Sequence, residues 1–117
     1  MARVALLTMS DGRDFVARDL TGFCREAEDA VAAALAAAGH QVERGGEPVS
    51  ASGIATSSAR RVAARQPDLT IFHYPVWAFP HFTTLAASAT SGPLLLLGSI
   101  DPAYPGMVGK PLGSPPG

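Results

Sequence analysis

The chain has 117 residues, a formal net charge of −1 and 16% charged residues. A chain of this length forms one domain, buries about two thirds of its unfolded surface and leaves no room for a second hydrophobic core. It contains no run of lysine or arginine, which argues against nucleic acid and anionic membranes as partners. The single cysteine, Cys24, excludes an internal disulfide and a cysteine-rich metal site. No apolar segment is long enough for a signal-peptide core or a membrane span, so we expect a cytoplasmic protein.

The first part of the chain predicts a strand followed by a long helix. Residues 3–9 form a continuous apolar run, which is typical of a central parallel strand covered on both faces. Apolar residues from Phe15 to Ala38 then recur at helical spacing. Gly39 predicts the end of this helix, and we expect His40 to act as a C-terminal cap.

A shorter strand and a second helix follow. Residues 41–44 predict a strand near an edge of the sheet, because the segment carries charge. Ser50 or Ser52 could cap a second helix, which ends before Pro67.

The remaining segments complete an alternating pattern. Residues 68–74 predict a third strand, residues 82–89 a third helix, and residues 93–97 a fourth strand that we expect to be buried on both sides. Strand and helix thus alternate through residues 1–109, which predicts an α/β domain: a three-layer α/β/α sandwich on a flavodoxin-like parallel sheet with strand order 2-1-3-4. Residues 110–117 are rich in proline and glycine and predict a disordered tail.

Two loops carry the candidate site residues. In this strand order the switch point lies between the first and third strands, so the loops at residues 10–13 and 74–82 face one crevice, where such sheets bind ligands. Arg13 could hold hydroxyl, carboxylate or phosphate oxygens with its fixed fork of donors. The structural alternative is a solvated arginine that pairs with Asp11 or Asp14.

The second loop is aromatic. Trp77 offers a flat apolar face for a sugar or a base, and its structural alternative is packing against the third helix. His81 is a candidate hydrogen-bond donor at the crevice rim. A metal site formed by His73 and His81 is rejected, because two prolines separate them and the stretch has no Cys, Asp or Glu to complete it.

Nucleophilic and nucleotide-binding functions find less support in these residues. Cys24 lies inside the first helix and is interpreted as a small core residue rather than a nucleophile. The 10–14 loop has one glycine and two carboxylates, which makes a poor cradle for phosphate, and dinucleotide and Walker motifs are absent. A nucleotide or flavin module is therefore the third hypothesis, after a sugar enzyme domain and a binding module.

Three ordered segments, residues 10–13, 76–81 and 101–109, resemble the N-terminal domain of the L-fucose isomerase family, which includes relatives that act on arabinose. The resemblance covers residues 2–109. It implies aldose–ketose isomerisation, in which a divalent metal, usually manganese, polarises the sugar while carboxylates move a proton through an enediol.

The resemblance also implies that catalysis and sugar contact belong to different domains. It places the metal ligands and catalytic carboxylates in domains that follow this one, so we expect no catalytic residue and no metal or other cofactor in this chain. It implies that Arg13 and Trp77 close over the sugar of a neighbouring subunit in a homo-oligomer. After Gly109 the chain departs from the family pattern, and we expect a truncated domain that is inactive alone. The alternative is a stand-alone flavodoxin-like module that binds a small ligand or a protein.

Overall fold

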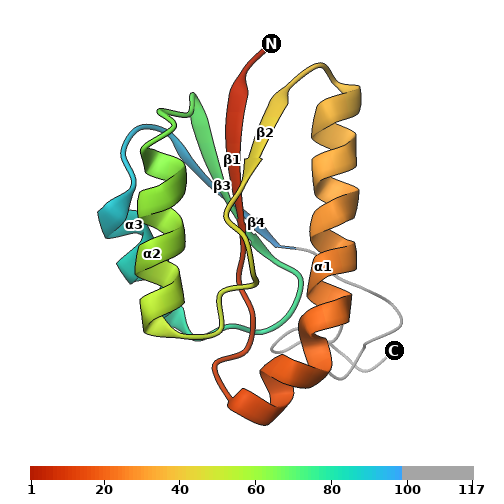
Figure 1. Ribbon diagram of the computed structural model, residues 1–117, viewed down its shortest axis with the longest axis vertical. Helices are drawn as coiled ribbons and strands as arrows, with labels where there is room; N and C mark the ends of the chain where they lie inside the picture. Colours follow the sequence, from red (N-terminus) through yellow and green to blue (C-terminus); the bar gives the residue numbers. More distant parts are fainter. Residues whose placement is uncertain (99–117) are drawn as a thin grey trace, which may run out of the picture.

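The computed structural model describes residues 1–98 and contains one parallel sheet with helices on both faces (Figure 1). All strand pairs are parallel, and the order is β2-β1-β3-β4, as predicted. Helix α1 covers one face and helices α2 and α3 cover the other, which confirms the flavodoxin-like α/β sandwich. The elements are β1 (Arg3–Thr8), α1 (Asp14–Ala37), β2 (Gln41–Arg44), α2 (Ser52–Ala63), β3 (Leu69–Tyr74), α3 (Pro80–Ala89) and β4 (Leu94–Gly98). The expected tail at 110–117 and the 101–109 segment lie outside the described residues.

The apolar run of β1 feeds both halves of the core. Side chains alternate along a strand, so Val4 and Leu6 pack with α1, while Ala5 and Leu7 pack against α2 and α3. Residues 4–9 are all buried, which explains why the run is continuous rather than alternating.

The end of α1 is set by Gly39, as predicted. Gly39 adopts a φ of +92°, which favours glycine, and its N–H donates to the carbonyl of Ala36. The N–H of His40 donates to the carbonyl of Leu35, which completes a Schellman motif. His40 thus caps the helix through its backbone, while its Nδ1 accepts a hydrogen bond from the N–H of Ala2 at 3.1 Å.

Two helix starts differ from the prediction. Neither Ser50 nor Ser52 caps α2, because Ala51 is the N-cap residue and no side chain bonds the first turn. Helix α3 begins two residues earlier than expected, at Pro80. Proline suits the first helical position, since its missing N–H would have no partner there.

The prediction that the fourth strand is buried on both sides is wrong. Leu94, Leu95 and Leu96 are exposed, Leu96 by 54%. β4 is the edge strand and pairs with β3 alone among residues 1–98. α1 packs against β1 and β2, and α2 packs against β1 and α3, so these helices leave β4 largely uncovered.

The candidate loops begin at the carboxyl ends of β1 and β3, and the carboxyl ends of all the parallel strands lie along one edge of the sheet. α1 has 24 residues and extends for about 36 Å, whereas the six residues of β1 span about 20 Å. The first turns of α1 therefore project beyond this edge, at the bottom of Figure 1, where Phe15 is exposed. None of the helices described is long and apolar enough to cross a membrane.

Candidate functional site

The loop after β1 lies against the loop after β3. Because β1 and β3 are neighbours, the N–H of Met9 donates to the carbonyl of His73 at 2.8 Å. The N–H of Ser10 donates to the carbonyl of Val49, also at 2.8 Å, so the start of the first loop is fixed on both sides. Further along, Gly12 contacts the ring of Phe79 so closely that an added Cβ would lie 2.4 Å from Cε2. The two predicted loops therefore meet.

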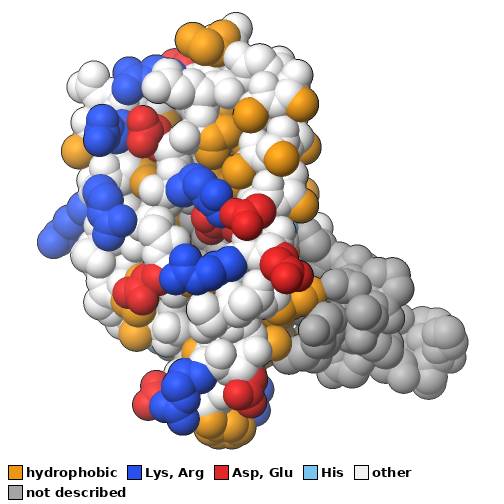
Figure 2. Space-filling model, turned by 45° about the vertical axis from the view of Figure 1, so that its right-hand side comes forward, with side chains coloured by type: hydrophobic (Ala, Val, Ile, Leu, Met, Phe, Trp, Pro, Cys, Tyr) orange, Lys and Arg blue, Asp and Glu red, His pale blue; other side chains and the backbone are white. Residues whose placement is uncertain are grey.

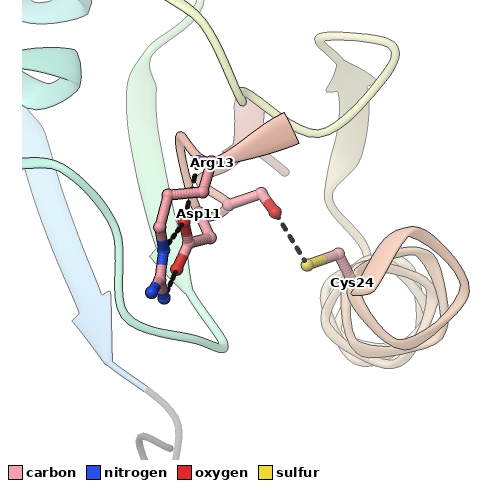
Figure 3. A network of polar contacts seen from close by, with 4 residues as sticks. Asp11, Arg13 and Cys24 are labelled. Carbon is pink, nitrogen blue, oxygen red and sulfur yellow. Dashed lines mark hydrogen bonds and ion pairs between the residues drawn. The ribbon is translucent and has the colours of Figure 1, made fainter. Parts of the chain in front are cut away.

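Arg13 forms an ion pair with Asp11, which is the pairing that the structural alternative predicted (Figure 3). The Arg13 N–H and Nε–H both donate to Asp11 Oδ1, at 2.8 and 3.0 Å, and Nη2 donates to Oδ2 at 2.7 Å. The Asp11 side chain is 2% exposed and that of Arg13 is 56% exposed. A buried carboxylate thus orients an exposed guanidinium.

This pairing leaves donors for a ligand. A guanidinium has five N–H donors, and two of them bond Asp11, so three have no acceptor among residues 1–98. The charges of Asp11 and Arg13 cancel, which makes the pair better suited to neutral hydroxyl groups than to a phosphate.

The guanidinium also changes the acidity of its partner. The hydrogen bond from Arg13 lowers the pKa of Asp11 below its ordinary value, although burial opposes the shift. Asp11 lies near the first turn of α1, where a negative charge is favourable.

The Asp11 carboxylate is expected to stabilise the domain at neutral pH and to lose this contribution in acid. Its folded pKa is depressed, so the stabilisation is present above the unfolded-state pKa of about 4 and disappears as the pH falls through the lower folded value. Asp11→Asn should therefore reduce the free energy of unfolding at pH 7 by on the order of 1 kcal/mol. Urea unfolding between pH 7 and pH 2 measures this, and a difference between the two proteins that does not shrink in acid would contradict the assignment.

Trp77 is partly exposed and belongs to an aromatic cluster at the start of α3. Its side chain is 46% exposed, and its ring meets Phe79 edge to face with centroids 5.3 Å apart. His81 is also exposed and packs beside Phe79 and Phe82, at 5.7 and 4.7 Å. Trp77 and His81 are thus both exposed and both lie against the ring of Phe79, which also contacts Gly12 in the loop of Arg13.

Cys24 is a core residue, as interpreted from the sequence. It is fully buried beside Ser10, with Sγ 3.7 Å from Oγ, and burial raises the pKa of its thiol (Figure 3). A raised thiol pKa disfavours the thiolate that nucleophilic chemistry needs. His73 is buried as well, and burial lowers the pKa of its imidazole while the nearby charge of Glu28 opposes the shift.

A hollow of about 440 Å³ lies away from these residues, between α1 and the loop after β2. Its lining residues are Arg25, Glu28, Asp29, Arg44, Gly46 and Glu47, so it includes none of the predicted site residues. Arg44 bridges Glu28 and Asp29 there. Basic and acidic side chains are interspersed over the face in Figure 2, so this face has no continuous basic patch of the kind that nucleic acid selects.

Within residues 1–98, no three His, Cys, Asp or Glu side chains lie close enough together to hold a metal ion. The nearest carboxylate to Arg13 is already committed to its guanidinium.

Sequence reasoning missed the contact that joins the loops. Gly12 and Phe79 lie within the segments 10–13 and 76–81 that carry the family resemblance, but their residue types alone predict no contact between them. The signals were present: a glycine directly before the arginine, and a phenylalanine two residues after the tryptophan and directly before a proline. Neither signal tells which distant segment fills the space beside the glycine.

The fold and these loops define a flavodoxin-like α/β domain with an exposed arginine and an exposed tryptophan at its switch point. The chain matches the family described as L-fucose isomerase, first N-terminal domain, over residues 1–111. Since the match spans almost all of the sequence, the chain belongs to this family, as its motifs predicted. Comparisons with curated proteins and with solved structures gave no match.

Proposed function

We propose that this chain is the N-terminal, substrate-contacting domain of an aldose–ketose isomerase, and that Arg13, Trp77 and His81 contact a sugar. The sugar is bound in a neighbouring subunit of a homo-oligomer, and the domain acts as a lid over it. The observation that carries the proposal is the contact of Gly12 with Phe79, which joins the loop of the oriented guanidinium to the loop of the exposed indole.

The chemistry of these side chains supports a sugar as the ligand. An indole packs on the C–H face of a sugar, and a forked guanidinium donates to neighbouring hydroxyl oxygens. Asp11 cancels the charge of Arg13, which favours a neutral polyol over an anion. These groups orient a ligand, but they supply neither a Lewis acid nor a base, so the isolated domain is proposed to be inactive.

The exposed edge strand supports an assembly. An exposed, uncharged edge with three leucines is a surface that proteins normally cover. We propose that another subunit of the homo-oligomer covers it, and a cytoplasmic location accords with the single buried cysteine.

Titration of the chain with L-fucose, D-arabinose and ribitol should produce a saturable change in Trp77 emission. Trp77 is the only tryptophan, so the signal has one source. The expected dissociation constant is on the order of 1–10 mM, because an indole face and a few hydroxyl bonds supply about 3–4 kcal/mol. No response to any of the three compounds would contradict the proposed sugar contacts.

Matched arginine variants sharpen this test. Arg13→Lys keeps the charge but loses the fork, and we expect sugar binding about tenfold weaker. Arg65 is exposed and lies between α2 and β3, at the amino ends of the strands and away from the candidate loops. Arg65→Lys should therefore leave binding unchanged. Formation of ketose from L-fucose by the 117-residue chain with manganese would contradict the proposed inactivity.

A further inference from the structure

Phe79 touches both loops of the candidate site. Its Cε2 and Cδ2 atoms lie where a Cβ on Gly12 would be, at 2.4 and 2.5 Å. The same ring also meets the ring of Trp77, with an interplanar angle of 74°. One aromatic ring is therefore the physical link between the residue beside Arg13 and the indole.

Phe79 is itself fixed by the core. It is the N-cap residue of α3, and its carbonyl accepts the N–H of Phe82 at 3.1 Å. The two rings stack with centroids 5.5 Å apart and an interplanar angle of 26°. Phe82 is buried in the core cluster beneath α2 and α3, so the position of Phe79 is set by packed side chains rather than by a solvated loop.

The glycine at position 12 provides the space for this ring. Its φ lies outside the left-handed region, so its backbone does not require glycine. Position 12 requires glycine because the Phe79 ring occupies the space that a Cβ would fill. Any larger side chain would displace this ring, which also contacts Trp77 and Phe82.

We infer that Phe79 is a positioning residue, which together with Gly12 sets the placement of the Trp77 indole relative to Arg13 and thereby the fit of the sugar between them. The ligand part of this inference rests on the proposed function, whereas the placement of the indole does not. A smaller side chain at position 79 would let the indole take other rotamers, and an alanine at position 12 would displace the ring.

The indole N–H resonance of the single tryptophan reports its placement, because it is sensitive to the ring of Phe79. We expect Phe79→Leu and Gly12→Ala to shift or broaden this resonance and to reduce the near-ultraviolet circular dichroism of the full chain. Phe79→Tyr, which keeps the ring, should restore the wild-type spectrum. Gly22→Ala, at a glycine with no neighbouring atom within 4 Å, and Phe15→Leu, at an exposed phenylalanine, are matched controls that should change neither signal.

Binding of L-fucose is then measured with the same variants. We expect Phe79→Leu and Gly12→Ala to raise its dissociation constant about twofold to tenfold, and Phe79→Tyr to leave it near the wild-type value. An unchanged indole resonance in Phe79→Leu would overturn the inference, whatever the dissociation constant for L-fucose. If Phe79→Leu loses its far-ultraviolet helical signal, an unchanged resonance in a folded Gly12→Ala would overturn it instead.

The two proposals fail in different ways. A changed indole resonance in a chain that gives no response to L-fucose supports the positioning of Trp77 by Phe79 and overturns the proposed sugar contacts. If Phe79→Leu and Gly12→Ala bind L-fucose with the same affinity as the wild-type chain, the role of Phe79 in ligand fit is overturned.

Discussion

Phe82→Ala is expected to lower the free energy of unfolding by about 3–5 kcal/mol, the usual loss when a buried phenylalanine is truncated. Phe82 is among the largest fully buried side chains and belongs to the same core cluster as Leu7, Phe72 and Ala86. Domains of this size are stable by about 5–15 kcal/mol, so the loss removes a large part of the total. The substitution also removes the ring on which Phe79 stacks, so it should disturb the environment of Trp77.

Urea unfolding followed by circular dichroism measures the effect. Phe82→Leu keeps most of the apolar volume and should cost about 1 kcal/mol. Phe15→Ala removes a ring of the same size from the exposed start of α1, and it should change stability by less than about 0.5 kcal/mol. Equal losses for Phe82→Ala and Phe15→Ala would show that Phe82 is not a core residue.

The fold could be predicted because its main signals are local. The apolar run at residues 3–9 identified the central strand, and Gly39 identified the end of α1, where the observed φ of +92° favours glycine. The strand order then followed from the alternation of strands and helices and from the right-handed crossover.

The burial of β4 could not be predicted in the same way. A run of four leucines is apolar whether it lies in the centre of a sheet or at its edge. The difference depends on which helices cover the strand, and that is a property of the whole arrangement. In the part of the chain described here, α1 packs against β1 and β2 and does not shield β4.

In the candidate site, too, the contact between residues close in sequence could be predicted and the contact between distant segments could not. The pairing of Arg13 with Asp11 was foreseen as the structural alternative, because an aspartate two residues before an arginine can reach both its backbone and its side chain. The contact of Gly12 with Phe79 joins loops that are far apart in sequence. Only the parallel sheet, which brings the exits of β1 and β3 to one edge, creates it.

Glu28→Ala is expected to lower the free energy of unfolding by about 1.5–3 kcal/mol, the contribution of a hydrogen bond to a charged group. The Glu28 side chain is 6% exposed, and its Oε1 accepts a hydrogen bond from Arg44 Nε at 2.7 Å. Burial of a carboxylate is costly unless such a partner offsets it. Arg44 is exposed enough to reach water after the change, which keeps the loss below that of a fully buried pair.

Asp29 provides a matched control, because the same arginine bonds it through Nη2 while its side chain is 65% exposed. Asp29→Ala should therefore change the free energy of unfolding by less than about 0.5 kcal/mol. Glu28→Met separates the two contributions of Glu28: it fills the same volume without a charge, and it should recover most of the lost stability if packing dominates. Urea unfolding of the three variants at pH 7 and low salt distinguishes these cases. Similar losses in Glu28→Ala and Asp29→Ala would mean that burial does not decide the strength of the ion pairs that fix α1 to β2.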